Sequence, residues 1–232
     1  CPLMVNLRDI KVEKRPRKLR FNGRILYLLD DAELMKRQLN GEDIELTPEL
    51  KARLRDQIST GEITPAYICY YFDERLGEFP YLGLRASGEF PVARGLVKKG
   101  GFVCSVSGKR RGKGSSREQS PYAELMAGIQ VVIAENIERI YNENWQNLGM
   151  LTSTDFSLID RIKRGEEIDL SVFTEGVHAI TKEIIEYGGL YEYNVARMQG
   201  RTTPELHASL ALGRLGDGAP ARDAQDVRFR RG

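Results

Sequence analysis

The order of strand-like and helix-like segments in the middle of this 232-residue chain predicts an α/β fold. "FVCSV" at 102–106 has the composition of a buried strand, and a polar loop follows at 107–118. "SPYAELMAG" at 120–128 is typical of a helix ended by a glycine, "QVVIA" at 130–134 of a second strand, and "NIERIYNENWQN" at 136–147 of a second helix. Strands joined through a helix need a crossover connection, so we expect them to be parallel and covered by helices, in a βαβα core.

The segments before this core predict a further strand and two further helices. "RILYLL" at 24–29 is a short apolar run that indicates a buried strand, and 30–39 has helical composition. "TPELKARLRDQI" at 47–58 predicts a helix in which Thr47 is the N-cap, since Pro48 suits the first helical position.

The remaining segments complete the predicted order of elements. "YICYYF" at 67–72 is rich in strand-forming residues, and 73–95 is broken by Gly and Pro and is expected to be mostly loop. "DFSLIDRIKRG" at 155–165 and "GVHAITKEIIEYGG" at 176–189 predict two C-terminal helices, the second ended by its two glycines.

Composition shifts divide the chain into three parts. Residues 1–20 alternate basic and apolar residues, as an arm or linker does, and the globular domain is expected to span 21–200. Residues 201–232 include "GDGAPARDAQD" and "RFRRG", which predict a flexible C-terminal tail.

Overall composition excludes several classes of protein. Apolar residues make up 41%, charged residues 29%, and the net charge of +2 favours no class of partner. No run of about 18 apolar residues predicts a membrane span. Cys1, Cys69 and Cys104 lie far apart without a CxxC pair, so we expect no metal or cluster site within the chain and a reducing cytoplasm as its location.

The segment "GKRRGKGSSREQSPYAE" at 108–124 allows three interpretations. A phosphate-binding Walker loop needs Ser or Thr directly after its lysine, but Gly114 follows Lys113. Nucleic-acid binding would need supporting aromatic residues or a known module, and neither accompanies the basic run.

The third interpretation is a glycine turn that opens a helix. Backbone N–H groups at such a turn have no intrahelical partner and favour negative charge, which suits a substrate carboxylate or a serine that loses its proton. Ser115, Ser116 and Arg117 would lie there. A capping box made by Ser115 and Glu118 would explain the same residues without any catalytic role, and local sequence does not separate these two readings.

A resemblance to a known family favours the catalytic reading. "GKGSSREQSPYAELMAGIQVVIAENIERIYNENWQNLGML" resembles the swivel domain, or small subunit, of the aconitase and isopropylmalate dehydratase family, in which a G-x-G-S-S-R-E turn precedes a short helix and a "VIA" strand. "NGRILYLLDD" is similar to the family's opening strand and "ITKEIIEYGGLYEY" to its closing helix. The likeness covers about 21–195, with 41–90 poorly matched. It implies a swivelling β/β/α-type domain.

The resemblance implies a role for each residue of the turn. Ser115 would be the catalytic base that removes a proton next to a carboxylate, and Gly114, Ser116 and Arg117 would bind a substrate carboxylate. The [4Fe–4S] cluster of such enzymes belongs to a large subunit, so this chain would be one half of a hydro-lyase or isomerase for a hydroxylated di- or tricarboxylate, active only with that partner. The alternative is a swivel-fold binding or scaffold protein without the chemistry, which binds a partner or nucleic acid through the basic 108–117 loop.

Two positions depart from the family pattern. Gln119 stands where the family usually has His, and Met35 stands where the last acid of an aspartate-rich stretch would fall. Arg85 is a candidate for a second substrate arginine, although a solvated loop arginine explains it more simply. Tyr141 and Trp145, four residues apart, are expected to be packing residues on one helix face.

Overall fold

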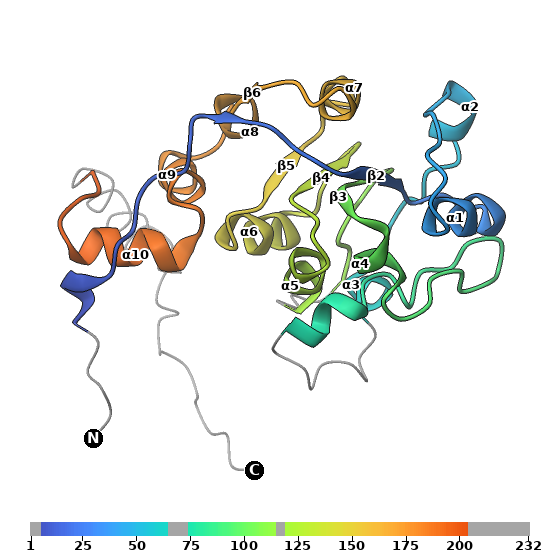
Figure 1. The fold of residues 1–232 in the computed structure, drawn as a ribbon, viewed down its shortest axis with the longest axis horizontal. Coiled ribbons are helices and arrows are strands. Elements are labelled where there is room, and N and C mark those ends of the chain that lie inside the picture. Colours follow the sequence, from blue (N-terminus) through green and yellow to red (C-terminus); the bar gives the residue numbers. More distant parts are fainter. Residues whose placement is uncertain (1–5, 65–73, 115–118, 204–232) are drawn as a thin grey trace, which may run out of the picture.

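The computed structural model describes residues 6–64, 74–114 and 119–203. Its centre is a parallel sheet in the strand order β2-β3-β4-β5 (Figure 1). The bounds of these strands are Arg24–Tyr27, Phe102–Ser107, Val131–Ala134 and Leu151–Ser153. All three pairings are parallel, which confirms the α/β fold with crossover helices.

Short helices surround the sheet, and two further strands pair outside it. In chain order the helices are α1 (Ala32–Leu39), α2 (Pro48–Lys51), α3 (Thr60–Ile63), α4 (Leu96–Gly100), α5 (Gln119–Met126), α6 (Arg139–Asn147), α7 (Leu158–Lys163), α8 (Ser171–Thr174), α9 (Ala179–Tyr187) and α10 (Leu190–Met198). The 3₁₀ turns η1 and η3 span Leu7–Asp9 and Glu74–Glu78. Strands β1 (Lys18–Leu19) and β6 (Ile168–Asp169) form an antiparallel pair.

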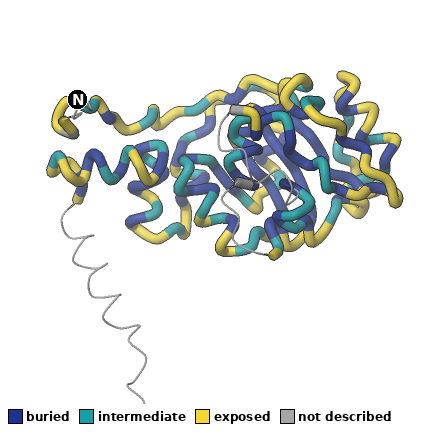
Figure 2. The backbone as a smooth tube through the Cα atoms, turned by 90° about the horizontal axis from the view of Figure 1, so that it is seen from below, coloured by how far each residue is buried: buried dark blue, intermediate teal, exposed yellow. Residues whose placement is uncertain are grey.

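The sheet separates two hydrophobic clusters. Every residue of β3 and β4 is buried, as in parallel sheets covered on both faces. One cluster joins Tyr27, Val106 and Ile133 to side chains of α7, α8 and α9, and the other joins Leu26 and Val132 to side chains of α1, α3, α4 and α6. Figure 1 shows α7 and α8 on one side of the sheet and α4, α5 and α6 on the other, and Figure 2 shows the buried segments gathered in the interior of the domain.

The helix predicted at 47–58 is correct only for its first turn. Thr47 caps α2, because its Oγ1 accepts a hydrogen bond from the Leu50 N–H at 3.3 Å. The chain then leaves the helix, and Arg55 donates its N–H to the Leu28 carbonyl oxygen at 2.7 Å. Leu54 is buried beside the end of β2 and forms an antiparallel bridge with Leu29. The chain therefore leaves the helix because burial and this bridge are more favourable than a longer, exposed helix.

The other predicted elements are mostly confirmed. The strands at 24–29, 102–106 and 130–134 and the helices at 30–39, 120–128, 136–147, 155–165 and 176–189 are all present. The predicted strand at 67–72 lies outside the described residues. Strand β5, which is only three residues long, and helix α10, which follows directly on the glycines that end α9, were not predicted.

The N-terminal segment lies along the outside of the domain. Strand β1 pairs with β6, where Lys18 Nζ lies 3.2 Å from Asp169 Oδ2, and Arg15 donates its N–H to the Glu186 carbonyl oxygen at 2.8 Å. Of the predicted tail, all but residues 201–203 lies outside the described residues. Within the described ranges, no helix is both long and apolar enough to cross a membrane.

Asp31 offers a test of how α1 is anchored. Its Oδ1 accepts a hydrogen bond from the Leu34 N–H at 3.0 Å and its Oδ2 lies 2.8 Å from Arg53 Nη2. The Leu34 N–H first, and the Arg53 guanidinium with it, lower the pKa of Asp31. We expect Asp31→Ala to lower the free energy of unfolding by about 1 kcal/mol at pH 7, as loss of an N-cap does.

This difference should depend on pH. A lowered pKa in the folded state means that the stabilisation is present above the unfolded value of about 3.9 and is lost as the pH falls below it. Urea unfolding of both proteins from pH 7 to pH 3 should therefore show the difference shrinking, and Asp31→Asn, which keeps the cap, should lose less at pH 7. A difference that is constant over this range would contradict the assignment.

Candidate active site at the carboxyl edge of the sheet

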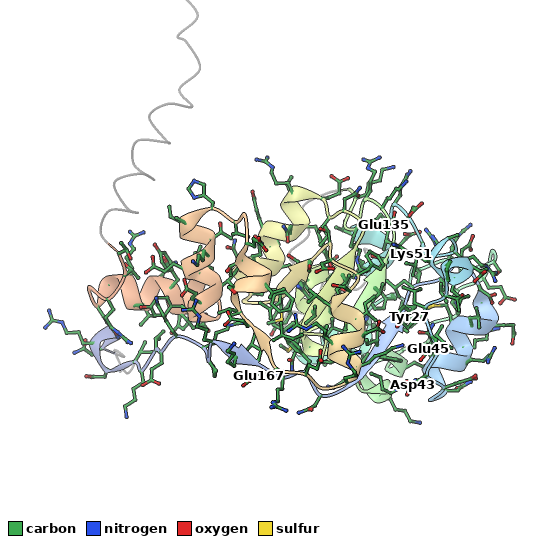
Figure 3. All side chains as sticks on the ribbon, turned by 90° about the horizontal axis from the view of Figure 1, so that it is seen from above. Tyr27, Asp43, Glu45, Lys51, Glu135 and Glu167 are labelled. Atoms are coloured by element: carbon green, nitrogen blue, oxygen red, sulfur yellow. The ribbon has the colours of Figure 1, made fainter. Side chains whose placement is uncertain are left out.

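The carboxyl ends of the parallel strands meet at one edge of the sheet, where ligands of open α/β folds bind. Residues 108–114 follow β3 there, and Glu135, labelled in Figure 3, follows β4 and donates its N–H to the Gly108 carbonyl oxygen at 3.1 Å. Two hollows border this edge. One of about 590 Å³ is lined by residues of 52–57 with Asp30, and one of about 530 Å³ is lined by residues that include Asn136 and Ser153.

Residues 112–114 are held by the backbone of 58–60. Gly112 and Lys113 both donate their N–H groups to the Ile58 carbonyl oxygen, at 2.8 and 3.1 Å, and Thr60 donates its N–H to the Lys113 carbonyl oxygen at 2.9 Å. The backbone of Ile58 and of Thr60, the first residue of α3, therefore holds the turn in place.

Both glycines of the turn have conformations that other residues rarely adopt. Gly112 has φ +84°, and a Cβ atom built there would lie 2.2 Å from Tyr141 Cγ. Gly114 has φ +114°, and its Cβ would lie 3.5 Å from Thr60 Oγ1. Close packing therefore requires glycine at 112, and backbone conformation favours it at 114.

The start of α5, on the C-terminal side of the turn, is bound to the same residue, Thr60. Helix α5 begins at Gln119, and the Ser120 hydroxyl donates to the Thr60 carbonyl oxygen at 3.0 Å. Thr60 thus binds Lys113 through its N–H and Ser120 through its carbonyl oxygen. The predicted site residues Ser115, Ser116 and Arg117, and the predicted cap partner Glu118, come between these anchors in the chain and lie outside the described residues.

The basic loop presents less positive charge than its sequence suggests. Arg110 Nε forms an ion pair with Glu138 Oε1 at 2.9 Å, whereas Lys113 keeps its charge and Nζ donates to the amide oxygen Oε1 of Gln57 at 3.1 Å. Arg111 is completely buried, so it is wrong to count it as part of a surface patch. This arrangement weakens the nucleic-acid interpretation.

Arg111 belongs to a buried polar cluster that the sequence interpretation missed. Its Nη2 lies 2.5 Å from Glu124 Oε2 and 3.0 Å from the Tyr81 hydroxyl, and its Nη1 donates to the Ser107 hydroxyl at 3.1 Å. The Tyr141 hydroxyl donates to the other oxygen of Glu124. These side chains meet behind the glycine turn, on the face of the sheet covered by α5 and α6.

The protonation states of this cluster are fixed by its burial and charge. Burial, and then the charge of Glu124, raise the pKa of both Tyr81 and Tyr141 well above the ordinary tyrosine value. Burial works to lower the pKa of Arg111, but Tyr141 and Glu124 outweigh it, and the pKa lies above its ordinary value. The arginine is therefore charged and both tyrosines are neutral at neutral pH.

Two patterns in the sequence indicate this cluster in retrospect. Ser105 and Ser107 alternate along a strand whose other positions are apolar, which places two hydroxyls on one buried face. Glu124 lies four residues after Ser120 and three before Ala127, both buried, so it shares their helix face and points to the core. A carboxylate on such a face needs a buried cation.

The other predicted residues occupy different environments. Arg85 is exposed, with its guanidinium carbon 5.1 Å from the centre of the Phe90 ring. Met35 lies on α1 and is buried in the core, and Gln119 is the first residue of α5. Tyr141 and Trp145 are both buried, with ring centres 6.1 Å apart and nearly parallel planes, which confirms their packing role.

The described residues offer no set of ligands for an iron–sulfur cluster. They contain no group of three or more His, Cys, Asp or Glu side chains that could hold a metal ion. Cys104 is buried in the core, where burial raises the pKa of its thiol. A buried neutral thiol is a poor ligand, because metals bind the thiolate.

Comparison with known proteins identifies the family of the chain. Residues 86–154 match the model of the aconitase C-terminal domain. The isopropylmalate/citramalate isomerase small subunit of Methanocaldococcus jannaschii is 32% identical over 158 residues, which is 62% of this chain and 90% of the relative. The 3-isopropylmalate dehydratase small subunit of Nitratidesulfovibrio vulgaris is 33% identical over 162 residues, 63% of this chain and 93% of the relative.

A solved structure is also similar. The crystal structure of 3-isopropylmalate dehydratase from Methanocaldococcus jannaschii is 28% identical, covers 67% of this chain and 93% of its own, and superposes with a TM-score of 0.45. The family match and the near-complete coverage of the relatives confirm the resemblance seen in the sequence. The chain therefore belongs to the aconitase family, as a homologue of the 3-isopropylmalate dehydratase small subunits, and its α/β unit is the family's C-terminal swivel domain.

Proposed function

We propose that this chain is the small subunit of a dehydratase or isomerase of the isopropylmalate type and supplies the base and the carboxylate-binding groups of the active site. The observation that carries the proposal is the turn at residues 112–114. It follows β3 at the carboxyl edge, is bound to the backbone of Ile58 and Thr60, and leads towards the start of α5 in a homologue of dehydratase small subunits.

Ser115 is the proposed base. A serine hydroxyl is far too weak an acid to lose its proton unaided, so its alkoxide must be stabilised by nearby donors and positive charge. The first N–H groups of α5 and the guanidinium of Arg117 are the groups of this chain that would provide them. The alkoxide would take the proton from the carbon next to a substrate carboxylate.

Gly114, Ser116 and Arg117 are proposed to bind a substrate carboxylate. An arginine fork matches the two oxygens of a carboxylate, and a serine hydroxyl can donate a further hydrogen bond. Gly114, with no side chain and φ +114°, lets the backbone approach the ligand. The substrate class is a hydroxylated dicarboxylate or tricarboxylate, and the relatives' names favour 3-isopropylmalate or citramalate.

The large subunit is the proposed partner and the proposed carrier of a [4Fe–4S] cluster. When bound by that partner, such a cluster would supply Lewis acid chemistry towards the substrate hydroxyl. Loss of a hydroxyl at neutral pH needs such an acid, and the described part of this chain has no metal site to supply it.

The proposal predicts that activity depends on the partner. The purified chain alone should be colourless and should not dehydrate 3-isopropylmalate, and mixing it anaerobically with a cluster-loaded large subunit of the family should restore turnover. The visible spectrum and the assay with and without the partner measure both points. Turnover by the chain alone would refute the half-site, and salt-sensitive RNA binding without any activity in the mixture would favour the nucleic-acid alternative.

A further inference from the structure

The ion pair between Arg111 and Glu124 has no exposed surface and lies beside the proposed site. Both side chains are 0% exposed, and Arg111 Nη2 is 2.5 Å from Glu124 Oε2. Taking two charges out of water costs about as much as their attraction returns, so a buried pair contributes little net stability compared with apolar residues of similar size. Stability alone therefore does not account for this pair.

The pair joins the two sides of the proposed catalytic segment. Arg111 directly precedes Gly112, where the turn begins, and Glu124 lies on α5, which begins just after the segment 115–118. A first link runs through Thr60, whose N–H donates to the Lys113 carbonyl oxygen and whose carbonyl oxygen accepts from the Ser120 hydroxyl, and the ion pair is a second link. Two separate links fix both the spacing and the orientation of the two ends.

The surrounding side chains hold the pair in one geometry. The Tyr81 hydroxyl lies 2.6 Å from Glu124 Oε2 and 2.9 Å from the Ser105 hydroxyl, while Tyr141 donates to the other carboxylate oxygen. Among the described residues, Arg111 Nε is the one nitrogen of the guanidinium without a hydrogen-bond partner. Almost every direction in which the pair could move would break a hydrogen bond.

The backbone around the cluster is strained in the way expected near functional sites. Among the described residues, the non-glycine residues with positive φ are Gln57, Tyr81, Ser87 and Arg110. Tyr81 has φ +66° although its bulky ring makes this conformation unfavourable, and its hydroxyl reaches the ion pair. Arg110 precedes the turn, and Gln57 accepts from Lys113. Strain of this kind persists only where surrounding contacts enforce it.

We propose that Arg111 and Glu124 are positioning residues: their buried ion pair holds the glycine turn and the start of α5 at the spacing that the catalytic segment needs. This inference rests on the proposed function for its effect on turnover, but its effect on the turn can be measured in the chain alone. The pair touches neither the substrate nor the reacting atoms, so it acts through the turn.

The test replaces the pair by apolar residues of similar size, as Arg111→Met/Glu124→Leu. The variant should still fold, because no charge is left unpaired, although the buried hydroxyls of Tyr81 and Tyr141 lose their partner Glu124. Amide hydrogen exchange of the isolated variant should become at least about tenfold faster at Gly112, Lys113 and Thr60, whose N–H groups form the turn's hydrogen bonds, with β4 unchanged. Unchanged exchange at these three amides would overturn the proposal.

The same variant should lose turnover with the large subunit. We expect kcat to fall at least about tenfold while the concentration of chain that saturates the partner stays the same, because a misplaced catalytic group affects the chemical step. A full kcat in the variant would also overturn the proposal. If the wild-type mixture itself is inactive, the proposed function fails, and hydrogen exchange still decides whether the pair positions the turn.

Tyr141→Phe is a milder variant for the case in which the double variant does not fold. It removes the hydroxyl that donates to Glu124 and keeps the ring that stacks on Trp145, so faster exchange at the turn and a lower kcat are again expected.

The matched control is Tyr27→Phe. Tyr27 is a buried tyrosine in the cluster on the other face of the sheet, near Asp43 and Glu45 (Figure 3), and its hydroxyl has no hydrogen-bond partner among the described residues. The control should change neither exchange at the turn nor kcat. If both variants behave alike, the ion pair has no special role.

Discussion

Ser115→Ala should lower turnover of the reconstituted complex by at least about 1000-fold, the upper part of the range for loss of a general base. Alanine cannot lose a proton at the position of the Oγ, and no other serine can take its place in a preorganised site. Stability should fall by no more than about 1 kcal/mol, which is the effect of losing an N-cap. Initial rates with 3-isopropylmalate and urea unfolding measure the two effects.

Ser157→Ala is the control for this variant. Ser157 is exposed and precedes helix α7, and its hydroxyl donates to Asp155. It shares with Ser115 a place just before a helix, but it lies outside the turn, so its replacement should leave turnover unchanged. Rates within tenfold of wild type for Ser115→Ala would exclude Ser115 as the base, and the capping-box interpretation would then account for the residue.

Gly112→Ala should be the most destabilising single substitution in the turn. The new Cβ would meet the Tyr141 ring at 2.2 to 2.7 Å, and φ +84° is unfavourable for alanine. Overpacking and backbone strain together are expected to cost about 2–4 kcal/mol. Relief requires movement of the turn or of Tyr141, which donates to Glu124, so kcat should fall as well.

Gly95→Ala separates the two causes. Gly95 has nearly the same φ, +80°, but a Cβ there would have no atom within 4 Å. Its replacement should cost only the backbone strain of about 1–2 kcal/mol and leave kcat unchanged. Urea unfolding compares the two variants, and equal losses of stability would show that contact with Tyr141 is unimportant.

Local sequence predicted the elements whose ends carry their own signals. The helix at 30–39 is capped by Asp31, and the helix at 176–189 ends at Gly188 in a left-handed conformation. The helix at 47–58 failed after one turn because Leu54 gains more from burial beside β2 than from continuing an exposed helix. Strand β5 was missed because a strand of three residues has no periodicity to detect.

The candidate site was predicted unevenly for a similar reason. A short motif marks residues 112–118, because its glycines and serines have distinctive backbone and chemical properties. The backbone groups of Ile58 and Thr60 that bind the turn lie about fifty residues earlier in the sequence, and no local pattern predicts that they pair with the turn. Arg111 falls within the run interpreted as a basic loop, since charged residues are mostly exposed, and only the position of Glu124 on the buried face of α5 indicates its partner.

The most direct test of the central claim is a competition between two forms of this chain for the large subunit. A fixed amount of cluster-loaded large subunit, saturated with wild-type chain, is titrated with Ser115→Ala under anaerobic conditions. We predict that activity falls in proportion to the fraction of variant, down to the rate of the variant alone, because the variant occupies the partner equally well without the base. Activity that stays at the wild-type level when the variant is in large excess, although the variant binds the large subunit, would contradict the claim that this chain supplies the catalytic serine.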